Sequence, residues 1–162
     1  MTVEYELSGR PLAVLNALAS RAEYLYYILK AMDDAGIDNA DEILKKATYA
    51  AGMARAKQMG AVNNPCELWK QILSNEDIRQ ILKVEWICED DNNVEINLHG
   101  CYMVWAWEKM GVPPEMIERL CKINNPVDYG QTEYFGYELD LDPGIGRGEG
   151  HCSLKIKTKK QT

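Results

Sequence analysis

Residues 84–100 read VEWICEDDNNVEINLHG, and this stretch decides the fold class. Apolar and polar side chains alternate on both sides of 90–93, which is a run of turn-forming residues, and this pattern predicts a β-hairpin. The apolar residues share one face of the hairpin: Val84, Trp86, Cys88, Val94, Ile96 and Leu98. The pattern therefore predicts a half-buried antiparallel pair, with Cys88 in the core and His99 on the polar side.

Before residue 83 the hydrophobic period is helical. Apolar residues recur every three or four positions over 11–35, which predicts one long helix that begins at Pro11 and ends before Gly36. A second helix, 39–60, is predicted from a capping-box pattern, Asn39 with Glu42. It is rich in alanine and glycine, so we expect it to pack directly on the first helix.

A third helical segment is predicted to begin at NNPCELW, where Asn64 caps the helix and Pro65 occupies its first position. Ser74 and Asp77 suggest a restart, which gives a helix, a kink and a second helix ending near Lys83. Together with the two helices before it, this segment predicts that the N-terminal half of the chain is helical.

After the first hairpin, short helices are predicted over 101–111 and 113–123, followed by a loop, NNPVDYGQTE, over 124–133. A second hairpin is predicted from two alternating runs with apolar faces: Tyr137, Leu139 and Leu141, then Cys152, Leu154 and Ile156. The chain is thus expected to be α+β, with N-terminal helical segments and a four-stranded antiparallel sheet whose hairpins are separated by two short helices.

The bulk composition is that of an ordinary globular protein. The 162 residues are 46% hydrophobic and 27% charged, which suits one domain over 1–162. The net charge of −7 disfavours a nucleic-acid partner, and no apolar run is long enough to span a bilayer. The first residues, MTVEYELSGRPL, lack a signal-peptide pattern, so we expect a cytoplasmic location.

The five cysteines do not predict a disulfide framework or a zinc ribbon, because their number is odd and no CxxC spacing occurs. The one adjacent His–Cys pair is His151–Cys152. Successive strand residues face opposite sides of a sheet, so the two side chains are not expected to share one metal or one substrate. Cys152 is predicted to face the apolar side.

A better cluster of reactive side chains lies on the short helix after the first hairpin. Cys101 and Glu108 are seven residues apart and therefore share a helix face, with Trp105 between them. Cys101 begins the helix, where free N–H groups favour a thiolate. These residues fit a site for a small polar substrate. They fit equally well an arrangement without a function, in which the thiol is buried, the carboxylate is exposed and the tryptophan belongs to the core.

Three stretches carry a resemblance to a known family: EILKKATYAAGMARAKQMGA (42–61), GCYMVWAWEKMGVPPEMIERLC (100–121) and GEGHCSLKI (148–156). In order and spacing they resemble the L-2-amino-thiazoline-4-carboxylic acid hydrolase family. The positions that match are Cys101, Glu108, Cys121, Gly148 and Cys152. The penultimate strand, YELDLD, lacks the arginine expected from that family, and Asn124–Asn125 stand where an acidic residue is expected.

The resemblance implies hydrolytic ring opening of a cyclic isothiourea. In that reaction the Cys101 thiolate attacks and Glu108 moves protons, or a Mn-like divalent metal activates water. The residues then expected to bind substrate in one shared cavity are Trp105, Cys121, Cys152 and the N-terminal tyrosines, above all Tyr26. The histidines are expected to lie outside this cavity.

Two other classes of function stay open. The helical half and antiparallel sheet resemble 4-vinyl-reductase-type domains, which implies a small-molecule-binding or sensor domain without chemistry. The small-residue helix 39–60 also suits the interface of a homo-oligomer. A thiol that alkylates readily near neutral pH would favour the enzyme, and an inert one would favour binding or a scaffold.

Overall fold

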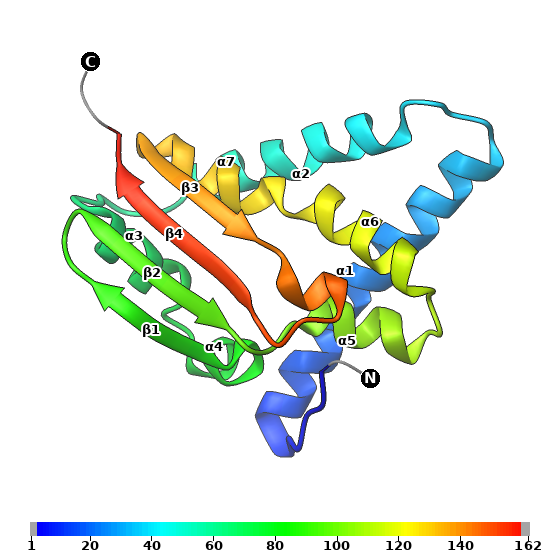
Figure 1. Cartoon of the computed structure of the whole chain (residues 1–162), viewed down its shortest axis with the longest axis horizontal. Coiled ribbons are helices and arrows are strands. Elements are labelled where there is room, and N and C mark those ends of the chain that lie inside the picture. The colour runs from blue at the N-terminus through cyan, green and yellow to red at the C-terminus, as the bar shows by residue number, and fades with distance from the viewer. Residues whose placement is uncertain (1–2, 160–162) are drawn as a thin grey trace.

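The computed structural model describes residues 3–159 (Figure 1). Four helices precede the first hairpin: α1 (Gly9–Asp34), α2 (Ala40–Lys57), α3 (Pro65–Ile72) and α4 (Glu76–Leu82). The hairpin consists of β1 (Val84–Glu89) and β2 (Asn93–Leu98). Three helices follow it: α5 (Tyr102–Lys109), α6 (Pro114–Asn124) and α7 (Pro126–Tyr134). Strands β3 (Tyr137–Asp142) and β4 (Cys152–Thr158) enclose a short 3-10 helix, η1 (Gly144–Arg147).

The four strands form one antiparallel sheet in the order β1-β2-β4-β3, which confirms the α+β class. Leu139 pairs with Ile156 and Leu141 with Leu154, so the apolar side chains of the second hairpin share one face, as the alternation predicts. Helices cover this face, with α3 against β2 and β4, and α7 against β3 (Figure 1). The other face carries charged residues, and Lys157 pairs across it with Glu138.

Capping residues determine where α3 and α4 begin, and therefore where the chain bends between them. The Asn64 side chain accepts a hydrogen bond from the backbone of Glu67, and Pro65 occupies the first turn, as expected. The restart differs from the prediction, since α4 is capped by Asn75, which accepts from the backbone of Ile78. Asn39 is the N-cap residue of α2, as predicted, but its side chain forms no capping hydrogen bond, so the expected capping box is not formed.

The expected loop over 124–133 is instead α7, so three helices rather than two separate the hairpins. Pro126 begins α7, and Gly130 lies inside it. A Cβ atom on Gly130 would lie 2.3 Å from the Tyr49 carbonyl oxygen, and one on Gly52 would lie 2.1 Å from that of Val127. The two helices therefore touch backbone to backbone, and α2 packs mainly on α7 rather than on α1 as expected.

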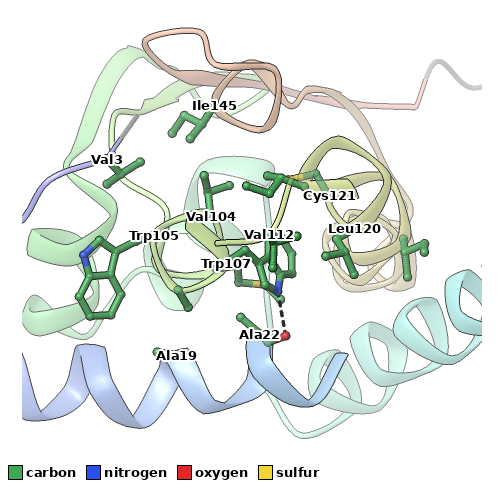
Figure 2. Packing of buried hydrophobic residues seen from close by; sticks show 14 of the residues in the cluster. Val3, Ala19, Ala22, Val104, Trp105, Trp107, Val112, Leu120, Cys121 and Ile145 are labelled. Atoms are coloured by element: carbon green, nitrogen blue, oxygen red, sulfur yellow. Dashed lines mark hydrogen bonds between the residues drawn. The ribbon is translucent and has the colours of Figure 1, made fainter. Parts of the chain in front are cut away.

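A large cluster of buried residues joins α1, α5 and α6 (Figure 2). Trp107 is fully buried at its centre, and its indole N–H donates a 2.8 Å hydrogen bond to the Ala22 carbonyl of α1. Arg119 of α6 forms ion pairs with Asp33 of α1 and Asp41 of α2, which connect these three helices. The cluster holds α5, and with it the loop at Cys101, in a fixed position.

A second cluster lies between the sheet and α3. Cys88 does not belong to it, which corrects the prediction of a core position. The strand pairing shifts between Trp86 and Cys88, and this β-bulge leaves Cys88 half-buried opposite Glu95. Among the helices described, none is long and apolar enough to cross a membrane.

Candidate functional site

A cavity of about 470 Å³ lies between the covered face of the sheet and the helices. This volume is in the range of small-molecule sites. One wall is apolar and comes from the sheet and from the α3–α4 segment. Its residues include Leu73, Ile78, Leu82, Leu98, Leu141 and Leu154. The alternation that places leucines on the inner face of the sheet thus forms half of the site.

The opposite wall is polar and comes from three helices. Asp128 and Gln131 are three residues apart on α7, so both side chains face the cavity. Arg55 of α2 and Arg21 of α1 also line it, both on its exposed side. Within residues 3–159 neither arginine forms a hydrogen bond or an ion pair. The cavity therefore combines apolar walls with two unpaired guanidinium groups.

Gln131 is a further polar group of this wall. The residue is 8% exposed, and its side chain forms no hydrogen bond with another residue of 3–159. Its amide is not among the fully buried polar atoms that lack a partner in this part of the chain. The amide is therefore open to the cavity, where water or a polar atom of a ligand can form a hydrogen bond with it.

Asp128 differs from the other carboxylates of the chain. Burial raises its pKa to about 6, although the positive charge of Arg55 acts to lower it. The side chain forms no hydrogen bond or ion pair within the described part of the chain. Asp128 is thus a carboxyl group that can change its protonation state near neutral pH inside the cavity.

Cys101 and Cys152 both line the cavity. Burial raises the pKa of the Cys101 thiol, and the nearby backbone amides of Val104 and Met103 oppose this effect only in part. Burial also raises the pKa of Cys152 to about 12. Both groups are therefore thiols rather than thiolates at neutral pH, which removes the expected advantage of the helix start.

We expect the Cys101 thiol to alkylate slowly in the folded protein at pH 7.5, because the thiolate is the reacting form. Iodoacetamide labelling followed by peptide mass spectrometry should show Cys101 modified more slowly than in the urea-unfolded chain, since a raised pKa lowers the thiolate fraction. The rate should rise with pH up to at least pH 9. Equal rates in folded and unfolded chains would contradict the assigned environment.

The other predicted site residues do not line this cavity. Cys121 lies in the core with Val104, Leu120 and Ile145, and its sulfur would be 2.6 Å from a Cβ on Gly146 (Figure 2). The expected wall of three cysteines is therefore wrong in its placement of Cys121. Its thiol nevertheless interacts electrostatically with Cys101 and Cys152, so the three sulfurs are neighbours.

Trp105 and Tyr26 are also outside the cavity. Trp105 is buried against Tyr5, with ring centroids 5.9 Å apart, and the Lys109 ammonium lies over its ring, 4.5 Å from the centroid. Tyr26 packs against Tyr27 on α1. The expectation that Trp105 and the N-terminal tyrosines line the cavity is thus wrong, because Trp105 is buried in the core of the helical layer, Tyr26 packs against that core, and Tyr24 and Tyr27 are exposed.

Glu108 lines a second cavity, of about 520 Å³, beneath η1. Its carboxylate accepts a hydrogen bond from the backbone of Val3 at 3.4 Å. The helix face shared with Cys101 therefore does not bring both residues to one cavity. The catalytic roles assigned to Cys101 and Glu108 stay predictions.

The histidines lie outside the cavity, as expected. His99 contacts the Glu85 carboxylate at 2.6 Å, and its ring is 5.5 Å from that of His151. Within residues 3–159, no group of three or more His, Cys, Asp or Glu side chains is arranged to hold a metal ion. The residues present therefore do not fit the Mn-like ion that the family resemblance implies.

Comparison with known proteins identifies the family. A family model described as L-2-amino-thiazoline-4-carboxylic acid hydrolase matches residues 17–156. The chain is also similar to the crystal structure of the phenol-responsive sensory domain of the transcription activator PoxR with phenol. The TM-score is 0.54 at 15% identity, over 89% of this chain and 75% of that chain, which supports a shared fold. No curated protein matches the sequence significantly.

Proposed function

The chain belongs to the L-2-amino-thiazoline-4-carboxylic acid hydrolase family, and on that premise we propose that its cavity binds a small organic molecule bearing a carboxylate group. The observation that carries this proposal is the position of Arg21 and Arg55, which form no ion pair within residues 3–159, beside an apolar cavity of about 470 Å³. A guanidinium group matches the geometry of a carboxylate and binds it with two hydrogen bonds. The leucines of the opposite wall suit the apolar body of such a molecule.

Two features support binding over thiol chemistry. The raised pKa of Cys101 makes its nucleophilic form scarce at neutral pH. Glu108, the expected proton carrier, lines the other cavity. The solved structure similar in fold contains phenol, which is a small aromatic molecule of the size that this cavity accommodates.

The test compares three probes: benzoate, phenol and 2-amino-thiazoline-4-carboxylate. We expect the two carboxylates to bind more tightly than phenol, measured by chemical-shift titration at pH 6. Arg55→Gln should weaken benzoate binding about 10- to 100-fold, the size of one lost charge-assisted hydrogen-bond pair. The matched control is Lys57→Gln, which removes the same charge from the same helix outside the cavity.

Equal loss of affinity in both variants would mean that only the net charge matters, and the assigned contact would be wrong. Absence of binding by all three probes would contradict the proposal.

Hydrolysis of a cyclic isothiourea is the second candidate, and the observation that favours it is the Asp128 carboxyl group beside Cys101. A group with a pKa of about 6 is suited to transfer protons near neutral pH. Incubation with 2-amino-thiazoline-4-carboxylate and chromatography for N-carbamoyl cysteine distinguishes turnover from binding alone. Product formed by the wild type but not by Asp128→Asn would favour the enzyme.

A further inference from the structure

Asp128 lies in the polar wall of the cavity, where its carboxyl group faces a molecule bound there. It lies on α7 one turn before Gln131, and both side chains line the cavity. Within residues 3–159 neither side chain forms a hydrogen bond or an ion pair, and neither is among the fully buried polar atoms that lack a partner. Both groups are therefore open to the cavity, where they can form hydrogen bonds with a bound molecule.

The charged and titratable groups that face Asp128 come from four elements. Arg55 lies on α2 and Arg21 on α1, and both remain positive throughout the neutral range. Cys101 and Tyr102 lie at the start of α5, and Cys152 begins β4.

Burial raises the pKa of Cys101, Tyr102 and Cys152, so these three groups stay neutral. Asp128 is therefore the group of this set whose charge changes between pH 5 and 8.

The charge of Asp128 opposes the binding of an anion. When Asp128 is ionised, its negative charge partly compensates that of Arg55, which acts on it electrostatically. A carboxylate bound by the arginines would then lie near a second carboxylate, and such pairs favour protonation of one member. The protonated carboxyl group can donate a hydrogen bond from its O–H to the ligand. It also no longer competes with the bound anion for the positive charge of Arg55.

We propose that Asp128 is a specificity-determining residue that takes up one proton when an organic anion binds at Arg21 and Arg55. This inference rests on the proposed function, because it assigns the ligand-linked proton to the same cavity. By linkage, the affinity for an anion then falls as the pH rises above the range in which free Asp128 is protonated. A ligand with a cationic group at Asp128 would give the opposite slope.

The test measures the dissociation constant of benzoate between pH 5 and 8 by isothermal titration calorimetry. Benzoate, like other carboxylic acids, stays mainly ionised over this range. From pH 6 to pH 8 the wild type is expected to lose about fivefold in affinity, which corresponds to a pKa increase from about 6 by about one unit on binding. Titrations at pH 6.5 in phosphate and in Tris should show net proton uptake from the buffer.

Two variants complete the experiment. Asp128→Asn keeps the shape of the side chain and should bind benzoate with an affinity that does not change between pH 6 and 8. Asp140→Asn alters an exposed carboxylate on the outer face of β3 and should behave as the wild type.

A flat profile in the wild type, a slope retained in Asp128→Asn, or affinity that rises with pH overturns the inference while leaving the proposed binding intact. Failure of benzoate to bind any of the three proteins at any pH overturns both.

Discussion

Replacing Trp107 by alanine is expected to lower the free energy of unfolding by about 3–5 kcal/mol, the range found for buried tryptophan and phenylalanine truncations. Trp107 is fully buried in the cluster that joins α1, α5 and α6, so its removal leaves a cavity that the rigid neighbours cannot fill (Figure 2). The hydrogen bond from its indole N–H to the Ala22 carbonyl is lost as well.

Urea denaturation followed by circular dichroism measures this change. The matched control is Tyr24→Ala, which truncates an aromatic side chain that is 71% exposed on α1, and it should alter the free energy of unfolding by less than about 0.5 kcal/mol. A loss below about 1.5 kcal/mol for Trp107→Ala would contradict the central position of this residue, because full burial of a large apolar side chain alone contributes about 1.5–3 kcal/mol.

The second large effect is expected from Gly130→Ala. An alanine inside a helix normally stabilises it by about 1 kcal/mol relative to glycine. Here the added Cβ would lie 2.3 Å from the Tyr49 carbonyl oxygen, so α2 and α7 must separate. We therefore expect a net loss of about 1–3 kcal/mol, as for other overpacked sites, and a fall in Tm of about 2–12 °C.

Thermal unfolding of Gly130→Ala beside Gly150→Ala provides the comparison, because a Cβ on Gly150 meets no atom within 4 Å. The Gly150 variant should unfold within about 2 °C of the wild type. Should Gly130→Ala raise Tm, the backbone contact between α2 and α7 would be wrong. The same variant should weaken benzoate binding, since Arg55 and Asp128 lie on the two helices that it separates.

The strands were predictable because their signal is local. The alternation around 90–93 and around the second hairpin identifies which side chains share a face, and the register confirms it except at the β-bulge beside Cys88. Helix α7 was not predictable, since its sequence, PVDYGQTEY, contains proline, glycine and β-branched threonine, which are weak helix formers. Its stability comes from the glycine contacts with α2, which are distant in sequence.

The candidate site was predictable only in part. Cys101 and Cys152 could be chosen from the helix start and from strand parity, and both line the cavity. Asp128 belongs to the segment interpreted as a loop. Arg55 could not be distinguished in the sequence from other charged residues on an exposed helix face, because its place in the cavity depends on the packing of α7 on α2. The one available signal was an acidic residue with a glutamine three positions later, which is too common to single out a site.

The central claim is that the cavity between the sheet and the helices binds a small carboxylate. Intermolecular nuclear Overhauser effects between benzoate and methyl-labelled protein at pH 6 test it most directly. We predict contacts from the benzoate ring to the methyl groups of Leu98, Leu141 and Leu154, which line this cavity. Contacts instead to Val112 and Ile117, which line the cavity beneath η1, or no contacts at saturating benzoate, would contradict the claim.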